Sequence, residues 1–247
     1  MGMPISIHIR GDDVDSPAVA LAVEEAFDLL READRLFSTY KEDSEVNRIR
    51  RRELDQALAD PLVLQVAAAC QHAGRITQGA FTDQLPDADG VLGFDPTGLV
   101  KGWAADRAAS RLADLPKSSF CLNAGGDVVV GGALGSGGEP GQAWRVGIED
   151  PRDRSRIAEV VEIQHGGVAT SGTAARGAHL YDPATDRFVD REGSVTVVGP
   201  SLMWADVWAT ALFVGPPSLS ATGRSRFDDA LGASTVSNTT KGLSLAR

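Results

Sequence analysis

Segments with helical and strand character do not alternate one for one along this chain, and this order constrains the fold most strongly. Two segments begin with a capping residue followed by proline, Ser16-Pro17 and Asp60-Pro61, which is a frequent helix start. The first predicts an amphipathic helix that ends before Phe37, and the second predicts a helix through Cys70. A shorter helix is predicted over about 102–113.

Strand candidates fill most of the remaining chain. They are short apolar or alternating runs at 119–123, 127–131, 144–149, 157–164, 168–170 and 194–199, and the first eight residues predict another strand. Because these strands do not alternate with helices, we expect an α+β domain. It would have a mixed or antiparallel sheet with packed helices, and not a doubly wound parallel sheet.

Composition and charge exclude several classes of protein. The chain has 247 residues, 43% of them hydrophobic, and a net charge of −10. An acidic chain lacks the basic face that a nucleic-acid-binding protein needs. No segment predicts a membrane span or a signal peptide, so the prediction is a cytoplasmic protein without membrane insertion. The two cysteines, Cys70 and Cys121, are expected to be buried thiols.

Asp206 and Thr210 form the most informative pair of polar residues. They lie four apart in the helix-like run 202–211, after a strand and the turn Gly199-Pro200-Ser201. Residues four apart share one face of a helix, and a carboxylate with a hydroxyl offers the hard oxygen donors that Mg²⁺ prefers. The alternative is a core helix whose polar pair is solvated or bonded to its own backbone.

Lys101 stands in a turn that leads into a helix, between Gly98 and Gly102. Glycines allow close backbone approach, and the start of a helix favours anions, so this segment can bind a phosphate. The alternative for Lys101 is a solvated lysine at a helix start, and for Gly98 a turn glycine without a further role.

Seven segments in order resemble the ApbE-type FAD:protein FMN transferases. They follow the order of that family, and the resemblance covers about residues 5–215: 37–40, 43–45, 79–81, 95–107, 123–127, 170–172 with 179–183, and 202–211. The resemblance implies one ApbE-like domain over 1–215. It also implies Mg²⁺-dependent transfer of FMN from FAD to a Ser or Thr hydroxyl of an acceptor flavoprotein, with release of AMP.

The resemblance assigns roles to individual residues. It makes Asp206, Thr210 and the Gly98 carbonyl ligands of Mg²⁺, and it places Lys101 and Asp95 beside FAD. It adds further contacts with the cofactor, namely Tyr40 against the isoalloxazine, Ala80, Phe81 and Thr82, and Ser171 and Leu180. An acidic protein that handles a polyanion needs local positive charge or a metal at its site, which agrees with these assignments.

His179 is the candidate general base, because an imidazole titrates near neutrality and this histidine lies in one of the matching segments. The alternative is a histidine that stabilises the turn before Asp182-Pro183. Two other functions remain open: a Mg²⁺-dependent FAD pyrophosphatase, in which water replaces the acceptor hydroxyl, and a flavin-binding protein without catalysis.

Residues 216–247 differ from the rest of the chain. They contain much Ser, Thr and Gly and few apolar residues, so we predict an atypical, flexible tail. Within it, residues 227–238 resemble the segment of acceptor proteins that receives FMN. This similarity makes Ser234 or Thr235 a possible acceptor within the same chain.

Overall fold

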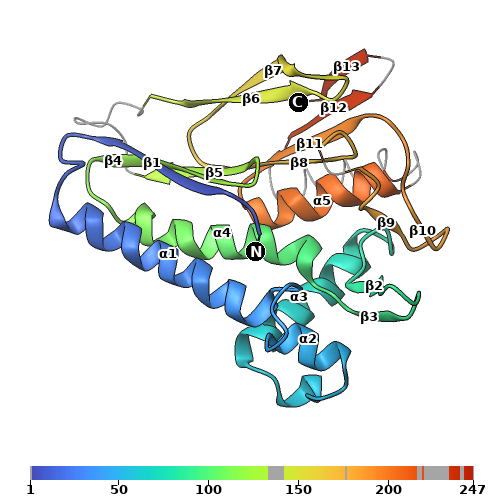
Figure 1. Cartoon of the computed structure of the whole chain (residues 1–247). Helices are drawn as coiled ribbons and strands as arrows, with labels where there is room; N and C mark the ends of the chain where they lie inside the picture. Colours follow the sequence, from blue (N-terminus) through green and yellow to red (C-terminus); the bar gives the residue numbers. More distant parts are fainter. Residues whose placement is uncertain are drawn as a thin grey trace.

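A seven-stranded antiparallel sheet forms the centre of the molecule, with helices on one face and a β-hairpin on the other (Figure 1). The computed structural model describes residues 2–132, 142–175, 177–215, 219, 234–239 and 242–246, the last two segments as backbone only. The order of strands in the sheet is β1-β4-β5-β8-β11-β12-β13. Their bounds are Ile5–Gly11, Ser118–Ala124, Asp127–Gly132, Gly166–Gly172, Ser194–Gly199, Ser234–Thr239 and Gly242–Ala246.

The helices pack beneath this sheet (Figure 1). Three of them make the layer closest to the strands: α1 (Pro17–Phe37), α4 (Thr97–Ala113) and α5 (Leu202–Val214). Farther from the sheet lie α2 (Glu45–Arg50), the 3₁₀ turn Gln56–Leu58 and α3 (Pro61–Ile76). None of the helices in the described residues is both long and apolar enough to cross a membrane.

Two hydrophobic clusters hold the layers together. The larger one lies between the sheet and the helices, where Leu99, Leu122 and Val207 are fully buried. The smaller one lies on the other face, under the hairpin of β6 (Trp144–Asp150) and β7 (Asp153–Ile163). Two short hairpins, β2 (Gln84–Pro86) with β3 (Leu92–Phe94) and β9 (Tyr181–Asp182) with β10 (Arg187–Phe188), complete the chain.

The α+β class predicted from the sequence is confirmed, and every internal strand candidate coincides with an observed strand. One boundary was wrong in a way that affects the site. Helix α4 begins at Thr97 and not near Gly102, so Gly98 and Gly102 lie inside it. Glycine has low helix propensity, but Leu99 and Val100 are buried here, and their packing outweighs that preference.

The end of the chain also differs from the expectation. Residues 234–239 and 242–246 are strands β12 and β13, paired antiparallel with β11 and with each other. They continue the sheet of the domain, whereas the sequence predicted a flexible tail over 216–247. Backbone hydrogen bonds between strands do not require apolar side chains, so a Ser- and Thr-rich segment can form a strand that hydropathy does not reveal. Apart from Leu219, the other residues of that stretch lie outside the described part.

Candidate active site

Three charged side chains from three elements meet below the sheet. The Lys101 ammonium, on α4, forms an ion pair with Asp127 at the start of β5. It also lies 3.3 Å from the Oδ1 atom of Asp206 on α5. Asp127 is 2% exposed and Asp206 is 3% exposed. We call these three residues the Lys101 cluster, and their burial shows that Lys101 is not a solvated surface lysine.

The two carboxylates keep Lys101 positively charged. Burial alone lowers the pKa of a lysine, because it removes water from the ammonium group. Here the charges of Asp206 and Asp127 and their hydrogen bonds outweigh burial, and the pKa of Lys101 lies above its ordinary value. Lys101 is therefore a fixed positive charge at neutral pH and not a proton donor or acceptor in that range.

Strand β8 holds both sides of this cluster in place. The Thr170 backbone N–H donates to Asp127 Oδ1 at 2.9 Å. The hydroxyls of Ser171 and Thr210 share a hydrogen bond of 2.9 Å. The predicted Asp206/Thr210 pair is therefore in contact with the sheet. Ser171, predicted to bind the cofactor, orients the Thr210 hydroxyl in this structure.

Asp95 fixes the start of α4. One of its carboxylate oxygens accepts from Arg50 at 3.0 Å. The other accepts from the backbone N–H of Thr97 at 3.1 Å and from the Thr97 hydroxyl at 2.6 Å. Its direction, uncertain from the sequence because Pro96 follows, is thus set by these partners. A role in binding FAD remains a prediction for this residue.

The segment 80–82 packs against the ends of two helices. Phe81 is 3% exposed, and a Cβ atom placed on Gly98 would lie 3.3 Å from its ring. Ala80 lies beside Gly215 at the end of α5, while the Thr82 hydroxyl accepts from the Gln84 backbone N–H at 3.0 Å. Phe81 therefore supports α4 from the core, and contacts with FAD would come from its neighbours or its backbone.

The donor set near Asp206 fits a hard cation such as Mg²⁺. It combines the carboxylate of Asp206 with the hydroxyl of Thr210. Asp127 adds a second carboxylate, which pairs with the Lys101 ammonium as Asp206 does. Among the described residues no group of three or more His, Cys, Asp or Glu side chains is arranged to hold a metal. Hydroxyl, carbonyl and substrate oxygens would thus have to complete the coordination of Mg²⁺.

The structure changes the argument for Gly98. The sequence placed its carbonyl in a turn before the lysine helix, but Gly98 is the second residue of α4. The carbonyl groups in the first turn of a helix are used within the helix. At this end of α4 the N–H groups of Thr97, Leu99 and Val100 already bond to Asp95 and Pro96, and a Gly98–metal contact stays a prediction.

His179 lies on the exposed loop between β8 and β9, and Leu180 follows it, half-buried against the main core. The His179 Nδ1 atom is 2.8 Å from the Gly177 carbonyl. Because a carbonyl only accepts hydrogen bonds, Nδ1 carries the proton, and Nε2 of the neutral ring is left free to accept one. That tautomer suits a general base that faces solvent.

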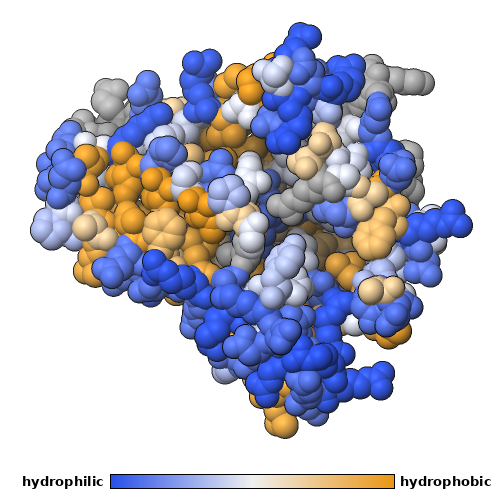
Figure 2. Space-filling view, in the orientation of Figure 1, coloured by the Kyte–Doolittle hydropathy of each residue, from blue (hydrophilic) through white to orange (hydrophobic). Residues whose placement is uncertain are grey.

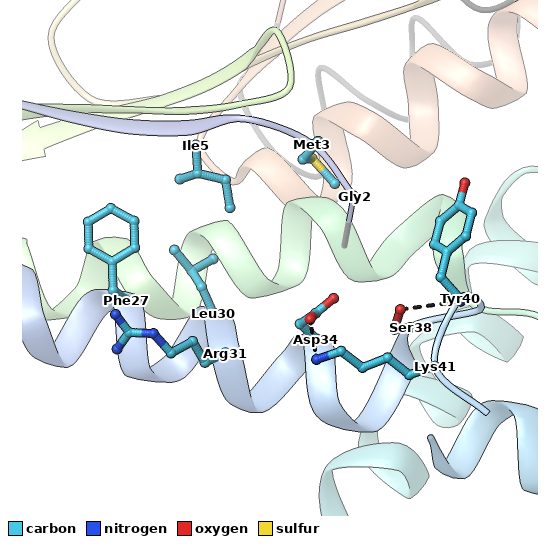
Figure 3. A pocket seen from close by; sticks show the side chains of 10 residues that line it. All are labelled: Gly2, Met3, Ile5, Phe27, Leu30, Arg31, Asp34, Ser38, Tyr40 and Lys41. Carbon is cyan, nitrogen blue, oxygen red and sulfur yellow. Dashed lines mark hydrogen bonds and ion pairs between the residues drawn. The ribbon is translucent and has the colours of Figure 1, made fainter. Parts of the chain in front are cut away.

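Tyr40 is 85% exposed and stands at one end of a groove of about 580 Å³ between α1 and β1 (Figure 3). The groove has an apolar floor that includes Ile5 and Leu30, and the ion pair Lys41–Asp34 at its rim measures 2.6 Å. Figure 2 shows hydrophobic surface over β1 and α1 next to it. Tyr40 is not part of the Lys101 cluster, but its exposed ring can stack on a flat aromatic ligand.

Asp127 is the residue whose role the sequence did not reveal. It ends the segment 123–127, which the resemblance included without assigning a task to its carboxylate. The signal was nevertheless present, because a lysine in an apolar helix needs an acidic partner if it is buried. The sequence identified Asp206 as a candidate metal ligand, but it did not predict that Asp206 or Asp127 would form an ion pair with Lys101.

Fold and site together define an α+β protein in which a buried ammonium is ion-paired with two carboxylates close to hydroxyl oxygen donors. The model of the ApbE family matches residues 1–85 and 82–226. The chain belongs to this family. The match extends past residue 215, where the sequence had placed the end of the domain.

Relatives with assigned names agree with this membership. A protein of Salmonella typhimurium named FAD:protein FMN transferase is 29% identical over 73% of this chain and 67% of its own length. One of Escherichia coli with the same name is 34% identical over 54% of this chain and 38% of its own length. The chain thus spans between about two fifths and two thirds of these two relatives.

Solved structures show the same fold at low sequence identity. The ApbE protein of Thermotoga maritima superposes with a TM-score of 0.79 at 20% identity, over 100% of this chain and 94% of the other. The flavin transferase ApbE of Vibrio cholerae gives 0.73 at 22% identity, with the same two coverages.

Proposed function

We propose that this protein transfers FMN from FAD to a Ser or Thr hydroxyl of an acceptor flavoprotein, depends on Mg²⁺ and releases AMP. The observation that supports this most is the Lys101 cluster, where a buried ammonium is held between carboxylates from β5 and α5. Membership of the ApbE family and the names of the relatives support the same activity.

The reaction breaks one bond of the pyrophosphate in FAD and forms one phosphoester. The acceptor oxygen attacks the phosphorus of the FMN half, and the bridging oxygen leaves with AMP. Lys101, which is paired with Asp127 and Asp206, would reach the pyrophosphate as a hydrogen-bond donor. Asp206 and Thr210 would hold Mg²⁺, which when bound neutralises negative charge on the phosphates. Tyr40 offers its exposed ring to the isoalloxazine.

In this proposal His179 removes the proton from the acceptor hydroxyl. Its Nε2 atom is available for this step because Nδ1 is engaged with Gly177. The histidine lies on an exposed loop, where a second protein can reach it. A base at the surface fits a reaction whose nucleophile belongs to another macromolecule.

The alternatives use the same site. A FAD pyrophosphatase would release FMN and AMP with water as the nucleophile, and a non-catalytic flavoprotein would only bind FAD. An acceptor within this chain, at Ser234 or Thr235, stays a prediction; the backbone of these two residues pairs with Val198 and Val197 in the sheet.

One experiment separates these functions. The purified protein is incubated with FAD, Mg²⁺ and a candidate acceptor, and AMP and the intact masses of both proteins are measured. We expect AMP and an acceptor heavier by one FMN. Free FMN with an unchanged acceptor would indicate a pyrophosphatase, and an FMN adduct on this chain would indicate self-modification. Absence of AMP would refute the proposal. A cytoplasmic location stays a prediction.

Asp206→Asn tests the metal. The amide keeps the shape of the side chain but loses the negative charge that a divalent cation needs, so AMP release should fall to background at any Mg²⁺ concentration. In the unaltered protein Mn²⁺ should replace Mg²⁺, and Ca²⁺ should support the reaction poorly because it takes longer bonds and more ligands. Full activity of the unaltered protein in excess EDTA would contradict the metal dependence.

A further inference from the structure

An acidic residue of α4 caps the start of α5 across the interface between the two helices. The Asp106 carboxylate accepts hydrogen bonds from the backbone N–H groups of Leu202 at 3.0 Å and Met203 at 2.9 Å. It also accepts from the Ser201 hydroxyl at 2.8 Å. The first N–H groups of a helix have no partner within it, so this carboxylate provides the hydrogen-bond acceptor for two of them at the start of α5.

The cap is shared between two residues. The Ser201 hydroxyl accepts from the Trp204 backbone N–H at 3.4 Å, while Asp106 accepts from the two preceding N–H groups. Burial raises the pKa of Asp106, and its three hydrogen bonds offset only part of that effect. The buried carboxylate therefore depends on these hydrogen bonds, because without them its burial would carry an uncompensated desolvation cost.

The same two helices touch backbone to backbone one turn earlier in α4. A Cβ atom on Gly102 would lie 2.6 Å from the Met203 Cα atom, so only glycine permits this approach. Gly102 follows Lys101, and three residues after Met203 comes Asp206. The contact between Lys101 and Asp206 therefore forms across the interface between α4 and α5, whose geometry is fixed by Gly102 and by Asp106.

We propose that Asp106 is a positioning residue for the phosphoryl-transfer site. By fixing where α5 begins against α4, it sets the position of Asp206 relative to Lys101 and so controls the rate of FMN transfer. In this proposal Asp106 acts through α5, whose start it contacts, and not as a member of the Lys101 cluster. This inference rests on the function proposed above, but its structural part can be tested separately.

The test compares two helix caps. Asp106→Asn keeps the size of the side chain, but its NH₂ group cannot accept a hydrogen bond, so the contacts of one of the two carboxylate oxygens with the start of α5 are lost. Asp60→Asn is the matched control, because Asp60 caps α3 by accepting from the Leu62 N–H at 2.9 Å and α3 carries no member of the Lys101 cluster. Unfolding midpoint, KM for FAD and kcat are measured for both variants and the unaltered protein.

We expect kcat of Asp106→Asn to fall by roughly 10- to 100-fold, the size of loss that a small misplacement of reacting groups produces. KM for FAD should change little, and Asp60→Asn should keep its kcat at a similar shift of the unfolding midpoint. An unchanged kcat in Asp106→Asn, or equal losses in the two variants, would overturn the proposal. If Asp106→Asn does not fold, Ser201→Ala takes its place. It removes the hydroxyl that donates to Asp106 and accepts from the Trp204 N–H, and it leaves the carboxylate. It should lower kcat, and an unchanged kcat would overturn the proposal.

Hydrogen exchange provides a readout that does not depend on activity. In Asp106→Asn the amides of residues 202–210 should exchange faster, including that of Asp206, while those of α3 stay as in the unaltered protein. Unchanged exchange in α5 would overturn the positioning role even if no acceptor is found. Absence of AMP release from the unaltered protein would instead refute the proposed function and leave this result interpretable.

Discussion

At position 101 a single lysine balances buried negative charge from two elements. Lys101→Met should lower the free energy of unfolding by about 3–5 kcal/mol, because it leaves the carboxylates of Asp127 and Asp206 without this partner. The raised pKa of Lys101 means that its stabilising effect is complete below the pKa of an unfolded lysine, about 10.4. The loss should therefore persist at pH 9 and shrink above pH ~10.4 in urea titrations.

The double variant Lys101→Met/Asp127→Asn provides the control for this prediction. It removes one of the charges that the single variant leaves unbalanced, so part of the lost stability should return. A double variant that is less stable than the single one would show that Asp127 stabilises the protein through the Thr170 N–H and not through Lys101.

At position 179 the expected effect is on rate and not on stability. His179→Ala should slow AMP release by about 10²- to 10⁴-fold if the imidazole is the base. Binding of FAD, measured by quenching of flavin fluorescence, should change much less, since the ring is exposed and, within the described part of the chain, bonds to its own loop. His8→Ala, at an exposed position on β1, is the control. An equal loss of FAD affinity would assign His179 to the pocket.

At the scale of elements, the site depends on how closely α4 and α5 approach. Gly102→Ala would place a methyl group 2.6 Å from the Met203 Cα atom, and such overpacking costs about 1–3 kcal/mol. Gly74→Ala in α3 should be neutral or slightly stabilising, because the nearest atom would be at 3.5 Å and alanine is the better helix former. Thermal unfolding of both variants checks this contrast.

The elements also show what the sequence can and cannot predict. Helix starts at Ser16 and Asp60 were correct because the capping side chains bond locally, to Val19 and Leu62. Helix periodicity alone was enough to place Asp206 and Thr210 one turn apart on α5. The partner of Lys101 could not be predicted, because Asp127 reaches it through the packing of β5 against α4, and local pattern carries no information about that contact.

At the scale of the molecule, the C-terminal residues belong to the sheet. Removing residues 216–247 should expose the hydrogen-bonding edge of β11, which β12 covers along Ser194–Val198. An exposed edge of a central strand is a template for pairing with other chains, so the truncated protein should unfold at lower temperature and aggregate. Light scattering during heating measures this, and a truncated protein as stable as the full chain would restore the view of a dispensable tail.

The antiparallel pairing of the first strand has a consequence for the order of folding. Ile5 pairs with Ala124, so β1 has no partner until more than a hundred further residues have been made. The ion pair between Lys101 and Asp206 likewise joins residues that are far apart in the sequence. Contacts so distant in sequence form slowly, because closing a long loop costs entropy before the contact repays it. During synthesis the helices α1 and α3 can therefore form early, whereas the Lys101 cluster is complete only after Asp206 has been made.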